Sequence, residues 1–270
     1  RALGLDCGPM SGFDAVKLRL GRPRAEDDLA AMRAVKKAIG PKVTLMCDFN
    51  QGLTVNDAIL RGRMLDDEGG LHWIEEPTRA DDFDGNARIA IDAILAAHSR
   101  IDGLVNNAGG QFPSPLRDIS LKGWEAVVRT NLTGGFLVAR ECYRRWMEKH
   151  GGAIVNMSAD MWGGMPGMAH SGAARAGMVN FTESAACEWA ASGVRVNAVA
   201  PGWIASSGFE TYPPEVQEWA KTLKTKIPLQ RFGTESEAAA AIVFLLSEAA
   251  SFITGVTLRI DGGQIEQRQR

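Results

Sequence analysis

Side chains that could bind a cation lie at two points in the first third of the sequence, close to where apolar runs end. Oxygen-bearing groups follow the second and third runs at Asp48, Asn50, Glu75 and Glu76. In a parallel sheet the strand C-termini share one edge, so these groups would meet there. Carboxylate and amide oxygens suit Mg²⁺. The same groups are also compatible with solvated or helix-capping carboxylates, so the pattern alone leaves both interpretations open.

The elements that would position these groups alternate between strand and helix. Residues 15–20 alternate between apolar and basic side chains, which predicts a strand, and 24–40 have helical spacing that ends at Gly40. The pattern repeats with a strand over 42–50, a helix N-capped by Thr54, and a strand over 71–77. Three such repeats predict a parallel sheet.

The remaining two thirds of the sequence repeat a different pattern, in which hydrophobic strands end in glycine-containing turns. Residues 86–98, NARIAIDAILAAH, read as one amphipathic helix. Four hydrophobic strands then run into glycine-containing turns, and long helical stretches separate them, the last capped by Thr234. These strands are IDGLVNNAGG, GGAIVNMS, GVRVNAVAPGW and GVTLRIDGG. We therefore predict four more parallel strands.

Composition narrows the functional classes. The chain has 270 residues, 45% hydrophobic and 23% charged, with a net charge of -2, and it has no basic stripe or membrane-length apolar run. We expect neither nucleic-acid nor membrane partners. The four cysteines form no CxxC pair and no signal peptide is visible, so we expect reduced thiols and a cytoplasmic location.

Residues 12–90 resemble the mandelate racemase branch of the enolase superfamily through AVKLRLG, MCDFNQ and WIEEPT. The resemblance implies proton abstraction next to a carboxylate by a Lys-x-Lys pair, with the enediolate on Mg²⁺. It places Lys17 and Arg19 at the pair and makes Asp48 and Glu75 metal ligands. A third carboxylate and the later acid–base groups are missing, and Arg19 is a poor base because it stays protonated. We interpret this site as vestigial, with Mg²⁺ bound weakly at most.

Residues 89–270 resemble the short-chain dehydrogenase/reductase family through NNAG at 106–109, NLTG from 131, Ser158 and PGW at 201–203. The resemblance implies an NADP or NAD cofactor. It implies that Asn131 supports a proton relay. The cofactor-binding positions it implies are Asn107, Ala108, Gly109, Pro201, Gly202 and Ile204.

The family's catalytic Tyr-x-x-x-Lys is replaced. At the family interval from Ser158 the chain has Ser171, and four residues on it has Arg175. A serine hydroxyl has too high a pKa to protonate an alkoxide as that tyrosine does, which disfavours ketone reduction. HSGAARAG and GGQFPSPL resemble trans-2-enoyl-CoA and dienoyl-CoA reductases, which implies an acyl-CoA thioester substrate. Ser158, Ser171 and Arg175 would then form a donor cluster for an enolate oxygen. Tyr212 is a further candidate on a substrate flap, although ordinary packing also explains it.

The Gly-rich turn that binds dinucleotide phosphates in this family is absent before residue 89, so we expect weak NAD(P) binding and impaired activity. We predict an α/β fold in which enolase-like units (1–88) and the dehydrogenase-like part (89–270) form one composite domain. Its single doubly wound, mostly parallel Rossmann-like sheet would have about seven strands, with helices on both faces. The small-residue helices suggest a homo-dimer or tetramer. A Mg²⁺-dependent racemase or dehydratase fragment and a non-catalytic chimera remain alternatives.

Overall fold

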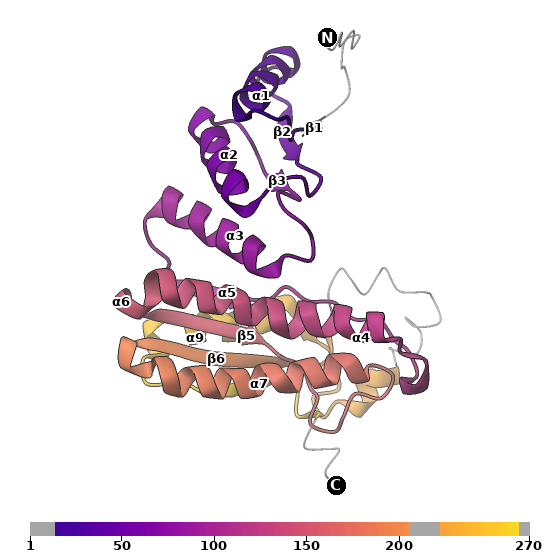
Figure 1. Cartoon of the computed structure of the whole chain (residues 1–270). Coiled ribbons are helices and arrows are strands. Elements are labelled where there is room, and N and C mark those ends of the chain that lie inside the picture. Colours follow the sequence, from indigo (N-terminus) through magenta and orange to yellow (C-terminus); the bar gives the residue numbers. More distant parts are fainter. Residues whose placement is uncertain (1–13, 206–221, 265–270) are drawn as a thin grey trace. The chain divides into compact units, whose positions relative to one another are not determined.

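The structure, a computed structural model, describes residues 14–205 and 222–264 (Figure 1). Tyr212 lies outside the described residues. The chain divides into two compact units, residues 1–99 and residues 100–270, and each is described by itself. Within the described ranges no helix has the length and apolar composition needed to cross a bilayer.

The first unit repeats strand and helix three times, as the sequence predicts. Its elements are β1 (Ala15–Arg19), α1 (Ala25–Ile39), β2 (Thr44–Asp48), α2 (Val55–Glu68), β3 (Ile74–Glu75) and α3 (Phe83–His98). The strands are parallel in the order β1-β2-β3. Thr54 caps α2 as predicted, since its Oγ1 accepts a hydrogen bond from the Asp57 N–H at 3.2 Å. Gly40 follows α1 with φ 75°, a conformation that favours glycine.

One face of this sheet packs against the helices. Strand alternation turns Leu45 and Cys47 of β2 into a core with Met32 of α1 and Leu65 of α2. The other face presents Lys17 and its polar neighbours. The sequence period therefore places the predicted cation-binding groups on the face that the helices leave open.

A buried ion pair joins α1, α2 and the turn after β1. Asp28 is 1% exposed, and its carboxylate pairs with the guanidinium of Arg61. The same carboxylate accepts hydrogen bonds from the N–H groups of Gly21 and Arg22 at 3.1 and 3.0 Å. Arg61 also donates to the carbonyl oxygens of Arg22 and Pro23. The buried carboxylate is stable in this environment because it is both ion-paired and hydrogen-bonded.

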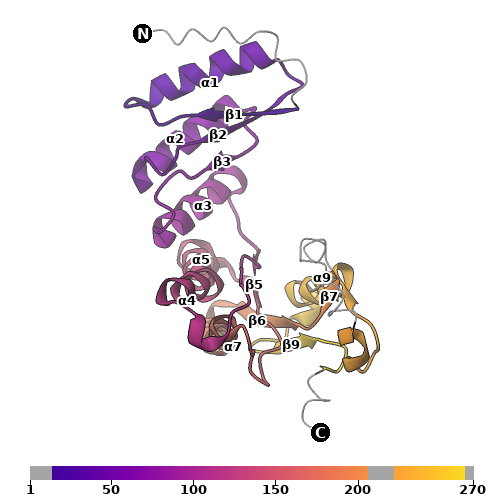
Figure 2. The same ribbon diagram turned by 90° about the vertical axis from the view of Figure 1, so that its right-hand side faces the viewer.

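The second unit is built around a four-stranded parallel sheet in the order β4-β5-β6-β9. Helices α4, α5 and α7 lie on one face of it and α9 on the other (Figure 2). Its main elements are β4 (Gly103–Asn106), α4 (Leu121–Val128), the π-helical turn η2 (Arg129–Thr133), α5 (Gly134–Cys142), the π-helical turn η3 (Tyr143–Met147), α6 (Glu148–His150), β5 (Gly152–Met157), α7 (Ala169–Trp189), β6 (Val194–Pro201), β7 (Ile204–Ala205), β8 (Gly233–Thr234), α9 (Glu235–Leu246) and β9 (Thr257–Ile260). Thr234 caps α9 as predicted, in a capping box with Glu237.

The α/β class with parallel strands is confirmed, but the expectation of one continuous seven-stranded sheet is wrong for the described residues. Three strands form one sheet and four form another, and β7 with β8 makes a small separate pair. Each larger sheet is held by helices and an apolar cluster of its own. β3 contributes only Ile74 and Glu75 to pairing, both with β2. A two-residue strand has few backbone N–H and C=O groups with which a further strand could pair. The sheet of the first unit therefore ends at β3.

Candidate active site

Asn131 fixes the loop that follows β4. It lies in the π-helical turn η2 and is 2% exposed. Its side-chain amide donates to the Gly110 carbonyl at 3.0 Å and accepts from the Gly110 N–H at 2.8 Å. π-helical turns inside α-helices are frequent at functional sites. Asn131 therefore holds the loop through 107–110, and both ends of its amide are already used there.

Arg175 of α7 reaches the same loop. A Cβ atom placed on Gly109 would lie 2.6 Å from Arg175 Nη2 and 2.8 Å from Asn131 Oδ1. Both distances are shorter than real Cβ contacts, so a side chain at 109 would force Arg175 or Asn131 to shift from this arrangement. The structure thus brings together three residues that the sequence predicts for one site.

Ser158 follows β5 and joins that strand to α7. Its hydroxyl donates to the Arg175 carbonyl at 3.2 Å, and Arg175 Nη1 donates to the Met157 carbonyl at 2.7 Å. The two bonds run in opposite directions between the same two segments. Ser158 therefore helps fix the α7 backbone at Arg175, while the Met157 carbonyl holds the guanidinium.

Ser171 is fully buried near the start of α7 and makes a contact that the sequence analysis missed. Its hydroxyl donates to Gln111 Oε1 at 2.6 Å. With its oxygen accepting from Ser171, Gln111 has its amide N–H₂ left to donate. The ring of the neighbouring His170, also buried, packs edge-on with Phe112 at 4.5 Å between centroids. Gln111 directly follows the NNAGG run, and this position in the sequence could have indicated it as a site residue.

Arg175 is a cation without a carboxylate partner in the described part of the chain. Burial lowers the pKa of its guanidinium, which still stays charged at neutral pH. Its Nε is buried and has no hydrogen-bond partner among the described residues. A partly desolvated cation of this kind favours negative charge placed next to it.

The loop after β6 meets the loop after β5. The Asp160 N–H donates to the Pro201 carbonyl at 3.3 Å, and the Gly202 N–H donates to the Ile260 carbonyl at 3.0 Å. A Cβ on Gly202 would lie 2.9 Å from the Cβ of Asp261. Ile204 begins β7. The C-terminal ends of these parallel strands therefore meet at one rim, as expected for an α/β site.

In the first unit Asp48 and Glu75 do lie together, but a side chain already stands between them. Lys17 Nζ is 3.3 Å from Asp48 Oδ2 and 2.8 Å from Glu75 Oε2. Hydrogen bonds to these carboxylates raise the pKa of Lys17, while the Asn50 N–H and Lys17 lower that of Asp48. Lys17 therefore remains an ammonium at neutral pH and is no general base.

The donors present do not fit a resident Mg²⁺. Among the described residues, nowhere do three or more His, Cys, Asp or Glu side chains lie close enough together to bind one metal ion. Asn50, a predicted oxygen donor, contributes its backbone N–H to Asp48 at 2.7 Å. Mg²⁺ would have to displace Lys17 to reach two ligands, so no reaction step is assigned to it here.

We expect Mg²⁺ to leave the melting temperature of the wild-type chain unchanged and to raise that of Lys17→Met. Removing the ammonium leaves two neighbouring carboxylates whose repulsion a divalent cation would relieve. Thermal unfolding with and without millimolar MgCl₂ measures this, with the exposed Lys37→Met as control. An equal rise in the wild-type chain would contradict it.

The turn after β1 does not offer the backbone N–H groups of Gly21 and Arg22 to an anion. Both of these N–H groups donate to Asp28. In the second unit β4 is an edge strand that pairs only with β5. Among the described residues, no further strand with a Gly-rich turn lies next to it. At the rim lie the three positions that the sequence predicts to contact a cofactor, Pro201, Gly202 and Ile204. No Gly-rich phosphate-binding turn occurs there in the described part of the chain.

Comparison with known proteins divides the chain in the same way. Residues 83–264 match the family model described as enoyl-(acyl carrier protein) reductase, and residues 9–105 match enolase C-terminal domain-like proteins. The chain is 40% identical over 185 residues to the protein named "Probable 2,4-dienoyl-CoA reductase" of Bacillus subtilis (strain 168), covering 67% of this chain and 72% of that one.

Two further similarities extend this finding. A peroxisomal 2,4-dienoyl-CoA reductase of Danio rerio is 41% identical over 177 residues, covering 64% of this chain and 58% of the relative, so this chain spans little more than half of that protein. The solved structure of citronellol catabolism dehydrogenase (AtuB) of Pseudomonas aeruginosa PAO1 superposes with a TM-score of 0.59 and 46% identity, over 93% of this chain and 95% of that one.

Proposed function

Because the chain belongs, over residues 83–264, to the short-chain dehydrogenase/reductase family, we propose that this part reduces the conjugated double bond of an enoyl-CoA or dienoyl-CoA thioester. The family implies NADP or NAD as the hydride source. The relatives named as dienoyl-CoA reductases support the thioester class. The proposal depends most on one observation, the partly buried guanidinium of Arg175 reaching Gly109 of the loop after β4, at a site that has serine and not tyrosine at position 171.

The side chains suit conjugate reduction better than ketone reduction. Ketone reduction must deliver a proton to an alkoxide, and a serine hydroxyl is too weak an acid for that step. Hydride transfer to the β-carbon of an enoyl thioester would leave an enolate with its charge on the thioester oxygen. Such an oxygen needs hydrogen-bond donors and a nearby positive charge. A proton taken up from solvent at the α-carbon would complete the reduction.

The described donors would divide this work. Gln111 accepts from Ser171 and so has its amide N–H₂ turned free to donate to a thioester oxygen. Arg175 provides positive charge near the same loop, held by its bond to Met157. Ser158 and Asn131 would position other residues and not contact the substrate, since their polar groups are hydrogen-bonded to Arg175 and Gly110. NAD(P)H, when bound, would supply the hydride.

We expect weak cofactor binding because the described residues contain no Gly-rich phosphate-binding turn. Contacts at the rim would orient the nicotinamide, but the pyrophosphate would lack backbone N–H donors among these residues. We therefore propose an impaired enzyme with a high KM for NAD(P)H. The cytoplasmic location and the homo-dimer or tetramer expected from the sequence stay predictions.

The decisive experiment follows NADPH and NADH oxidation by the full chain at millimolar cofactor. We expect slow turnover with trans-2-enoyl-CoA or 2,4-dienoyl-CoA and none with a 3-oxoacyl-CoA. Cofactor binding is measured independently by nucleotide fluorescence and thermal shift. Absence of both binding and turnover would reject the proposal in favour of a non-catalytic chimera, and preferred turnover of the 3-oxoacyl-CoA would reject the assigned reaction.

A further inference from the structure

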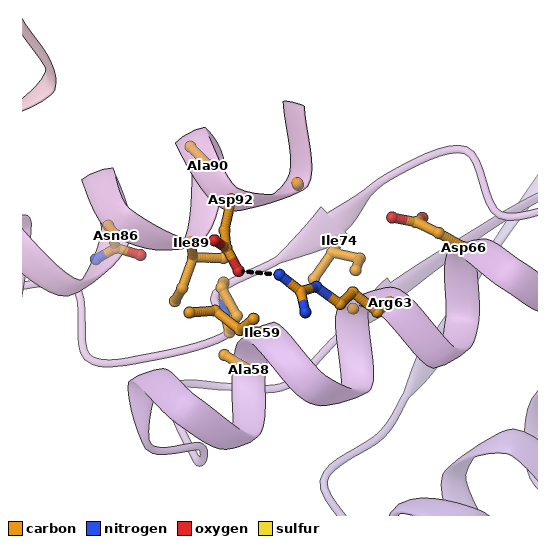
Figure 3. Close-up of a pocket in the computed structure, with 12 residues that line it drawn as sticks. Ala58, Ile59, Arg63, Asp66, Ile74, Asn86, Ile89, Ala90 and Asp92 are labelled. Atoms are coloured by element: carbon orange, nitrogen blue, oxygen red, sulfur yellow. Dashed lines mark hydrogen bonds and ion pairs between the residues drawn. The ribbon is translucent and has the colours of Figure 1, made fainter. Parts of the chain in front are cut away.

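The first unit contains a groove between α2 and α3 that no part of the proposed reaction uses. Its volume is about 310 Å³, within the range of small-ligand sites. Aliphatic side chains line its length, with Ile59 from α2, Ile74 from β3 and Ile89 from α3 (Figure 3). All of its lining residues belong to the first unit.

Small side chains keep this groove open. α3 presents Ala90 and Ala93 to it, and α2 contributes Ala58 and Gly62. α3 also lies in the stretch shared by both family matches, 83–264 and 9–105. The small side chains that α3 presents to the groove leave space that larger residues would fill.

The charged groups of the groove leave one carboxylate without a cation. Arg63 Nη2 is 2.8 Å from Asp92 Oδ2, and the Asp92 side chain is 8% exposed (Figure 3). Asp66, one turn further along α2, lines the same groove, and no cation of the described chain is within ion-pair distance of it. The three charged lining groups therefore sum to one negative charge.

The end of α2 adds to this negative potential. Its last turn contains no basic residue, and the C-terminus of a helix favours cations. The neighbouring cations are used elsewhere, since Arg33 pairs with Glu68 and Lys36 donates to the Gly69 carbonyl at 2.8 Å. Partial burial and the charge of Asp67 raise the pKa of Asp66, which a bound cation would reverse.

We propose that this groove binds a linear aliphatic primary ammonium, with the ammonium group at Asp66 and the hydrocarbon chain along Ile59, Ile74 and Ile89. The apolar length suits a short alkyl chain, and the net negative charge selects an amine over a carboxylate of the same length. The occupant is a small organic cation, and its binding is independent of the reductase site.

The test uses the full chain and three probes of one length: n-hexylammonium, hexanoate and 1-hexanol. Calorimetry and thermal shift should show saturable binding of hexylammonium and weaker binding of the other two. Asp66→Asn should weaken hexylammonium binding roughly three- to tenfold, toward the affinity of hexanol, because an exposed-rim ion pair contributes modestly. Asp67→Asn, the same change in net charge one residue away, should weaken it less than Asp66→Asn does, because Asp67 does not line the groove.

A filled groove provides the second test. Ala90→Leu should abolish hexylammonium binding without lowering the melting temperature, while Ala96→Leu, on the same helix but outside the groove, should bind as the wild type does. Equal or tighter binding of hexanoate or hexanol would overturn the proposal. So would hexylammonium binding that survives both Asp66→Asn and Ala90→Leu, because the cation would then be held elsewhere.

Discussion

Asp28→Ala should selectively unfold the first unit. The substitution leaves the Arg61 guanidinium buried without its carboxylate and removes the acceptor for the N–H groups of Gly21 and Arg22. Breaking a buried pair by removing one partner costs about 3–5 kcal/mol. Hydrogen exchange read by mass spectrometry should therefore show peptides from 20–65 exchanging about 10²–10³-fold faster. Peptides from 103–157 should keep their protection, because they belong to the other unit.

Glu26→Ala is the matched control on the same helix. Glu26 is exposed and pairs with an exposed Arg24 at 3.6 Å, and surface pairs contribute little. Asp28→Asn should fall between the two, since it keeps the volume and one acceptor oxygen while losing the charge. If Asp28→Ala exchanged no faster than Glu26→Ala, the buried pair would not be what holds α1 and α2 together.

The sequence predicts those parts of the fold that are encoded locally. Alternation in residues 15–20 gave β1, and the stop at Gly40 ends α1 where expected. Thr54 and Thr234 are N-caps because their hydroxyls need only reach an N–H three residues on. These features depend on neighbours in the chain, so the sequence contains the whole signal.

Features that depend on distant partners could not be read in this way. Strand pairing depends on which strand edges meet, and the hydrophobic periodicity of a sequence carries no information about that. The prediction of a single sheet was therefore wrong for the described residues. Asp28 reads as one acid among several in the first turn of a helix, although Arg61 makes it a buried hub. The enolase resemblance places Lys17 at a proton-abstracting pair, and only the register of three strands reveals that two carboxylates hold it as an ammonium.

The candidate site shows the same division. The family resemblance predicts Asn131, Ser158, Ser171 and Arg175 as site residues, and each of them makes a hydrogen bond in the structure. Their catalytic and cofactor-binding roles stay predictions. Gln111 was missed because its importance arises from contact with Ser171, 60 residues away in the chain.

Arg175→Met should abolish most of any reductase turnover while leaving the second unit folded. The variant removes the positive charge nearest the donors that would stabilise a thioester oxyanion, and losing one such group costs about 10²–10³-fold in kcat. A methionine fills much of the same volume, and replacing a partly buried charge with an apolar chain is often neutral for stability. The melting temperature should therefore hold while kcat/KM for an enoyl-CoA falls.

Arg175→Lys separates charge from geometry in the same assay. Lysine keeps the positive charge but lacks the planar fork through which Arg175 binds the Met157 carbonyl, so its activity should be intermediate. Ser171→Ala is expected to change the rate less, because Gln111 retains its amide donors when the serine hydroxyl is lost. A loss of stability in Arg175→Met as large as its loss of rate would instead assign Arg175 the structural task of joining α7 to β5, with no electrostatic part in the chemistry.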